Sequence, residues 1–200
     1  MTVSRSAMNN EKVSPVSGKR DRVLANSDRI FLKFGSYGID VLEDGHGLRV
    51  SDLFSIHDGV KINRTLAVVL YPTQVETAFA KEHAAIIGGQ SIGIVFNKSG
   101  WQIDKRHLYF GTIETASDTS ASGSFFRVGQ KPLAIHIYSL LVKQNGAAYH
   151  YATIAEVHHP DYLTLEDLHA VYGEAFETSE EEGKSIEALL KVVKDRLQRT

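Results

Sequence analysis

A long hairpin signal is the feature that most constrains the fold of this chain. Residues 133–143 and 149–158 are two strand-like segments rich in apolar side chains, and Gln144-Asn145-Gly146 separates them. An Asn-Gly pair readily supplies the two positive φ angles that a tight hairpin turn requires. Two long strands joined by so short a turn pair antiparallel. The sequence therefore predicts an antiparallel sheet built around this hairpin.

Further strands are expected before this hairpin. Asp58-Gly59 is a second hairpin signal, and it separates strands predicted at residues 48–57 and 61–71. The other segments predicted in this part of the chain are a strand at 38–42 before a turn at Glu43-Asp44-Gly45, a short apolar element at 92–96, a strand at 101–113 and a Ser- and Thr-rich loop at 115–124.

Helices are predicted in two regions. Apolar residues recur at helical spacing over residues 73–87, which Gly88-Gly89 ends. Thr164 opens a capping pattern for one C-terminal helix, and a second is expected over residues 179–199. The predicted fold class is α+β, an antiparallel sheet with helices on one face, plus C-terminal helices.

The chain divides into three parts on composition. Residues 1–27 are polar and without apolar periodicity, so we expect a flexible N-terminal leader. Residues 28–162 carry the strands and are expected to form one domain, and residues 163–200 form a C-terminal helical extension. We expect the second helix of the extension to pack on the domain through its apolar face.

Charge and composition exclude several classes of function. The net charge is -2, and no basic stripe indicates a nucleic-acid partner. No apolar run is long enough to span a bilayer, so no membrane association is expected. The chain has no cysteine, which excludes disulfides and thiolate metal sites and fits a reducing cytosol. We expect a cytoplasmic protein.

Two arginines and one glutamate are the candidate site residues. Arg64 shares its strand parity with Leu66 and Val68, which predicts a buried guanidinium that needs an anion. Arg49 lies on the neighbouring strand, so each arginine could hold one carboxylate of a small substrate. Glu156 lies on a partly apolar strand face and could act as a general acid. A structural Arg–Glu ion pair would explain the same pattern.

The order of segments resembles that of the chorismate pyruvate-lyase family, whose ligand-binding fold relatives are the UTRA domains. The resemblance covers roughly residues 34–162. The segments that carry it are Leu48-Arg49, Asp58-Gly59, Arg64-Thr65, Ser91-Ile92-Gly93-Ile94-Val95-Phe96, residues 105–111, and the final hairpin from Tyr138 to Glu156-Val157-His158-His159-Pro160. In the family, the glutamate of a closing Glu-X-X-X-Pro motif is catalytic.

The resemblance implies a cofactor-independent enzyme that eliminates pyruvate from chorismate to give a hydroxybenzoate. Glu156 takes the position of the general acid, Arg49 and Arg64 take the substrate-binding arginine positions, and Ile92 would line the pocket. The implied fold is chorismate lyase-like, the implied partner is a small dicarboxylate, and no metal or organic cofactor is expected.

Two alternatives remain open at this point. In the first, a UTRA-like module uses the same arginines to bind an anionic small molecule without chemistry. In the second, a non-catalytic member of the family binds a partner protein through its C-terminal helices.

Overall fold

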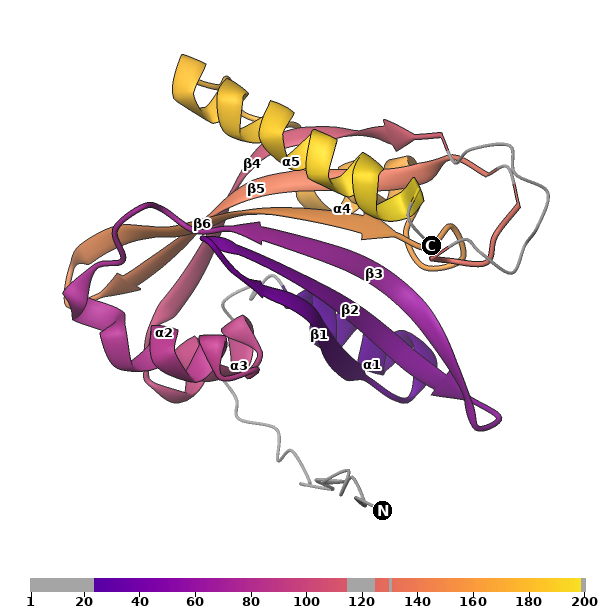
Figure 1. The fold of residues 1–200 in the computed structure, drawn as a ribbon, viewed down its shortest axis with the longest axis horizontal. Coiled ribbons are helices and arrows are strands. Elements are labelled where there is room, and N and C mark those ends of the chain that lie inside the picture. The colour runs from indigo at the N-terminus through magenta and orange to yellow at the C-terminus, as the bar shows by residue number, and fades with distance from the viewer. Residues whose placement is uncertain (1–23, 115–124, 130, 199–200) are drawn as a thin grey trace.

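A six-stranded antiparallel sheet in the order β1-β2-β3-β6-β5-β4 forms the centre of the computed structural model (Figure 1). The structure describes residues 24–114, 125–129 and 131–198. The strands are β1 (Gly38–Gly45), β2 (Leu48–His57), β3 (Val60–Leu70), β4 (Gln102–Ile113), β5 (Leu133–Gln144) and β6 (Ala147–His158). The helices are α1 (Asn26–Phe34), η1 (Thr77–Phe79), α2 (Ala80–Ile87), α3 (Ile92–Lys98), α4 (Leu165–Tyr172) and α5 (Glu180–Gln198). The predicted α+β class with an antiparallel sheet is confirmed.

Tight turns join the paired strands as the sequence predicts in two of three cases. Asn145-Gly146 and Asp58-Gly59 each have two positive φ angles, as expected for such hairpins. The turn predicted at Glu43-Asp44-Gly45 was wrong in position. Strand β1 continues through Gly45, and His46 and Gly47 supply the positive φ angles instead, at 53° and 77°.

Four helices cover one face of the sheet, which we call the inner face. Helices α2 and α3 enclose a core cluster that includes Phe79, Ile86 and Phe96, together with Tyr151 and Ile154 of β6. Helices α1 and α4 enclose a second cluster further along the same face, in which Ile30 and Leu168 contact strand residues such as Ala67. Between these clusters the inner face carries polar side chains.

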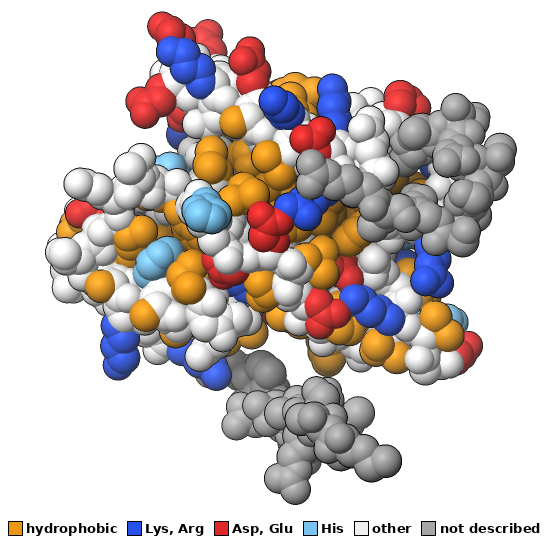
Figure 2. Space-filling model, in the orientation of Figure 1, with side chains coloured by type: hydrophobic (Ala, Val, Ile, Leu, Met, Phe, Trp, Pro, Cys, Tyr) orange, Lys and Arg blue, Asp and Glu red, His pale blue; other side chains and the backbone are white. Residues whose placement is uncertain are grey.

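Helix α5 lies on the opposite face, so helices cover both faces rather than one. Leu189 and Val193 of α5 are buried against strand residues of the sheet that include Val68 and Val157. The predicted packing of the last helix on the domain is therefore confirmed. Figure 2 shows charged side chains gathered over the first turns of α5, where Glu180, Glu181 and Glu182 lie.

The remaining predicted segments have mixed outcomes. The short apolar element at 92–96 is helix α3, and the helix predicted over 73–87 is shorter, because η1 begins only at Thr77. Thr164 and Asp167 form the predicted cap of α4. Asn26 is buried at the start of α1, so the leader ends earlier than residue 27. The rest of that leader, residues 1–23, and the loop at 115–124 lie outside the described residues.

None of the helices within the described ranges is long and apolar enough to cross a membrane.

Candidate functional site

Strand register places Glu156 in the middle of the inner face. Ala67 of β3 pairs with Glu156, which in turn pairs with His136 of β5. The same row continues outward to Ser51 of β2 and Phe110 of β4. Because paired residues share a sheet face, these five side chains point to the same side. The predicted parity of Glu156 with Ala152, Ile154 and His158 is consistent with this row.

The Glu156 carboxylate is buried and incompletely paired. Its side chain is 7% exposed, and Oε2 lies 3.9 Å from Lys105 Nζ. Within the described part of the chain, no hydrogen bond reaches Oε2. Burial raises the pKa of the Tyr138 phenol, and the charge of Glu156 and a side-chain hydrogen bond between the two residues raise it further. A buried carboxylate oxygen with no donor is costly, so a donor from a water or ligand would be favourable there.

Lys105 of β4 is a site residue that the sequence analysis did not identify. Its ammonium lies 4.0 Å from the centre of the Tyr138 ring and 5.8 Å from that of Tyr172. The quadrupoles of these rings attract a cation and so favour the charged form of the lysine. Burial lowers the pKa of Lys105, and the charge of Glu156 opposes that shift. Its neighbour Arg106 points to the other face, where it pairs with Glu182 of α5.

Arg49 of β2 lies on the same face of the sheet, toward its β1 edge. Its Nη1 donates to the carbonyl oxygens of Ile86 at 2.7 Å and Gln90 at 3.1 Å, and its Nε donates to Ser51. Its buried Nη2 makes no well-formed hydrogen bond among the described residues, and the Tyr71 phenol is its neighbour. Burial raises the pKa of that phenol, and the charge and hydrogen bonding of Arg49 oppose the rise. The guanidinium is thus fixed by the end of α2.

Tyr37, just before β1, has a pKa that both Glu156 and Arg49 affect. Burial raises the pKa of Tyr37 to about 12, a hydrogen bond to Ser91 opposes this shift, and smaller effects come from Glu156 and Arg49. Strand register gives the geometry: Arg49 pairs with Val69, which pairs with Ile154, two residues before Glu156 on the same face. With the 3.9 Å approach of Lys105 to Glu156, all three lie on the inner face.

Two buried histidines flank Glu156 in the neutral form. Burial lowers the pKa of His158 to about 4, and it strongly lowers the pKa of His136. His136 Nε2 lies 2.8 Å from His107 Nδ1, and His158 Nδ1 lies 3.1 Å from the Thr65 hydroxyl. The other ring nitrogen of each histidine is buried without a partner in the described ranges. Several polar atoms around Glu156 therefore lack partners.

Arg64 is buried as predicted, but it lies in a different environment. Its Nε donates to the Ser55 hydroxyl at 2.8 Å, and its guanidinium lies 3.7 Å from the centre of the Phe34 ring. The nearest carboxylate that affects its pKa is that of Asp161, which opposes the lowering caused by burial. The structure does not bring Arg64 to the region that Glu156 and Arg49 share.

The parity argument for Arg64 was wrong, and a β-bulge explains the error. Leu66 and Val68 face α5, whereas Arg64 contacts α1 on the inner face. The register of β2 and β3 shifts between Leu53 and Phe54, which leaves Arg64 as the extra residue. A bulge breaks the alternation of side chains along a strand.

Ile92, the predicted pocket-lining residue, opens helix α3. It is partly buried and packs against the core cluster under α2 and α3. It directly follows Ser91, which hydrogen-bonds Tyr37. This places Ile92 at the border of the site region.

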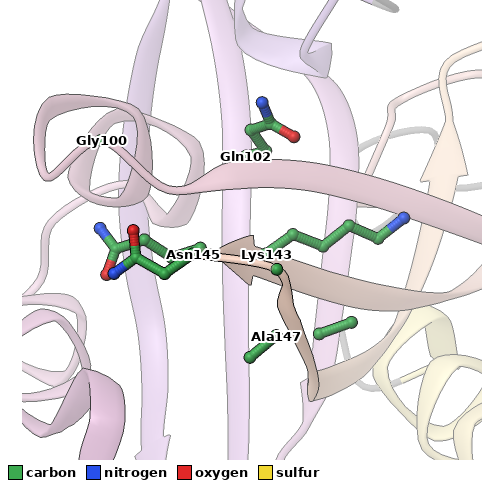
Figure 3. Close-up of a pocket in the computed structure, with 8 residues that line it drawn as sticks. Gly100, Gln102, Lys143, Asn145 and Ala147 are labelled. Carbon is green, nitrogen blue, oxygen red and sulfur yellow. The ribbon is translucent and has the colours of Figure 1, made fainter.

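Two cavities of the described part of the chain lie outside this region. One, of about 520 Å³, lies at the turn end of the β5–β6 hairpin, where Figure 3 shows Gln102, Lys143 and Asn145 around it. Ala147 lines it, nine residues and about 30 Å along β6 from Glu156. The other, of about 410 Å³, lies between α1 and α4 and includes Tyr162. Burial raises the pKa of Tyr162, and the charge of Glu156 adds to that rise.

No group of three or more metal-ligating side chains is arranged to hold an ion within residues 24–114, 125–129 and 131–198. No family model matches the chain, and no curated protein matches it.

Proposed function

We propose that this protein is a chorismate lyase-like enzyme that eliminates pyruvate from chorismate and releases a hydroxybenzoate. One observation carries the proposal. The buried Glu156 carboxylate faces cationic side chains at the centre of an antiparallel sheet, and its Oε2 has no partner in the described part of the chain. The segment order that resembles the lyase family, and the α+β fold that the family implies, support the same function.

The chemistry requires little more than binding and one proton donor. The C–O bond to the enolpyruvyl group breaks, the ring loses a proton as it becomes aromatic, and the departing enolpyruvate becomes pyruvate. Protons and electrons balance without a redox partner. Glu156 would give its proton to the departing group, and Arg49 would hold one carboxylate through its Nη2, beside Tyr71. Aromatisation of the ring supplies much of the driving force.

Incubation of the purified protein with chorismate tests the proposal. Pyruvate release would be followed with a coupled assay, and the aromatic product would be identified by mass. The Glu187→Gln variant changes an exposed glutamate of α5 and serves as the matched control for changes at Glu156. Absence of turnover by the wild-type protein would contradict an enzyme of this class.

The second candidate is a UTRA-like module that binds an anionic small molecule without chemistry. What supports it is that Arg49 is 1% exposed and Glu156 is 5% exposed, because such enclosure suits retention of a ligand without any chemical step. Binding of chorismate or a hydroxybenzoate without any pyruvate release would identify this function.

A further inference from the structure

The site region holds two basic side chains and one carboxylate. Arg49 and Glu156 are buried and Lys105 is 14% exposed, so one positive charge is left over when all three are ionised. The other groups that face Glu156 are uncharged near neutral pH. They are the tyrosines Tyr37, Tyr138, Tyr162 and Tyr172, whose pKa values are raised, and the histidines His136 and His158, whose pKa values are lowered. Arg29 of α1 also approaches Tyr172, but it is partly exposed and solvent screens its charge.

Lys105 has unused hydrogen-bonding capacity. The 3.9 Å distance between its Nζ and Glu156 Oε2 is too long for a hydrogen bond, and its other close contact is the face of the Tyr138 ring. Among the described residues, no hydrogen bond from this ammonium is found. An ammonium carries three donors, and this one is largely shielded from solvent, because the Lys105 side chain is 14% exposed. A ligand would supply an acceptor that the neighbouring side chains do not.

We propose that Lys105 is the second anion-binding residue of the site, and that a dicarboxylate binds together with one proton, which Glu156 holds. This inference rests on the proposed function, because it takes a substrate with two carboxylates as the ligand. It assigns to Lys105 the place that the sequence pattern gave to Arg64.

Charge balance is the reason for the proton. Two carboxylates neutralise Arg49 and Lys105, and an ionised Glu156 would then be an unpaired buried anion. Protonation of Glu156 restores neutrality. A ligand with a single carboxylate leaves one cation for Glu156, which can stay ionised. Binding of a dicarboxylate therefore protonates Glu156, the acid that the elimination needs. A monocarboxylate product leaves Glu156 ionised.

Arg64 is less suited to this role than Lys105. Its guanidinium is already in contact with Ser55 and the Phe34 ring. Lys105 points to Glu156 itself.

Calorimetry with two unreactive ligands tests the inference. The dicarboxylate 3-(carboxymethoxy)benzoate and the monocarboxylate 3-methoxybenzoate differ by one carboxylate. Each would be titrated into the full-length protein near neutral pH, in buffers that differ in ionisation enthalpy, so that the slope of the observed enthalpy gives the protons taken up. We expect uptake of about one proton with the dicarboxylate and almost none with the monocarboxylate.

Variants separate Lys105 from the rival arginine. Lys105→Met keeps the apolar stem, and it should weaken dicarboxylate binding by about tenfold or more and reduce proton uptake. The control Lys143→Met removes an exposed lysine that pairs with Asp104 on the neighbouring strand, and it should bind as the wild type does. Circular dichroism would check that each variant is folded.

The results that overturn the inference are distinct from those that overturn the enzyme. Dicarboxylate binding without proton uptake, unchanged affinity in Lys105→Met, or a loss of affinity in Arg64→Met alone would each overturn it while chorismate turnover persists. Proton uptake that Lys105→Met diminishes would support it even if the wild-type protein releases no pyruvate. Failure of the wild type to bind the dicarboxylate overturns the inference as well.

Discussion

Lys105 on β4 and Glu156 on β6 bring their charges to within 3.9 Å of each other, although strand β5 lies between them. The lysine side chain crosses the ring of Tyr138, a β5 residue, to reach the carboxylate. Neither charge has solvent as its main partner, since both side chains are less than 15% exposed. Removing such a pair from water costs free energy, and a ligand that supplied the missing hydrogen bonds would offset part of that cost.

Replacement of Glu156 by Gln should remove the acid while keeping the shape of the side chain. We expect kcat for pyruvate release to fall by about a hundredfold or more, because a positioned acid typically contributes that much. The KM for chorismate should change far less, because the amide can still fill the site. Steady-state kinetics of this variant beside Glu187→Gln would measure both effects. Turnover that survives the change would show that another group donates the proton.

The local chemistry of turns made much of the fold predictable. The residues Asn145-Gly146 and Asp58-Gly59 are of types that tolerate positive φ. The two hairpins and their strand pairing could therefore be predicted from short sequence signals. Glu156 was also placed on the correct face, because β6 alternates regularly from Ala152 to His158. The turn at His46-Gly47 was not predicted, because Gly45 gives a competing turn signal one residue earlier.

The composition of the site was harder to predict, for two physical reasons. The bulge at Arg64 depends on how two strands pair, and no local pattern in β3 reveals it. Lys105 lies within the polar run Asp104-Lys105-Arg106-His107, which is typical of a solvent-facing strand. Its burial results from α4 and Tyr172 covering that end of the sheet, which is a tertiary effect. Strand alternation alone predicts neither the bulge at Arg64 nor the covering of Lys105.

Stability should fall in acid because of His158. Burial lowers the pKa of this histidine from its ordinary 6.5 to about 4, so the folded protein binds fewer protons than the unfolded chain between these values. The neutral form stabilises the fold above about pH 6.5, and this stability is lost as the pH falls toward 4. One group with this shift contributes a loss of about 2 kcal/mol between pH 7.5 and pH 5.

Urea unfolding of the wild type and of His158→Asn at both pH values would isolate this contribution. Protonation of other buried histidines also destabilises the fold in acid. The difference between wild type and variant is therefore the informative quantity, rather than the pH dependence of either protein alone. We expect the variant to lose about 2 kcal/mol less than the wild type over the same range. Identical losses in the two proteins would contradict the assignment to His158.

Arg49 should matter for stability as well as for binding. Its guanidinium donates to the carbonyl oxygens of Ile86 and Gln90 at the end of α2, and both bonds are at least partly buried. Arg49→Met leaves these acceptors unpaired, which should cost about 2–4 kcal/mol of unfolding free energy. Chemical denaturation would measure it. A binding defect in this variant is therefore interpretable only after its folded fraction is known, and a cost below about 1 kcal/mol would contradict the structural role.

Two glycines that face open space should respond in opposite ways to alanine. A Cβ at Gly146 or at Gly183 meets no atom within 4 Å, so neither change creates a clash. Gly146 has φ of 81° in the β5–β6 turn, where alanine is strained, and Gly146→Ala should destabilise the protein by about 1 kcal/mol. Gly183 lies inside α5, where alanine loses less backbone entropy on folding, and Gly183→Ala should stabilise it by about 0.5–1 kcal/mol. Urea unfolding of both variants under one set of conditions tests the pair, and changes of the same sign would contradict either the turn geometry or the packing of α5.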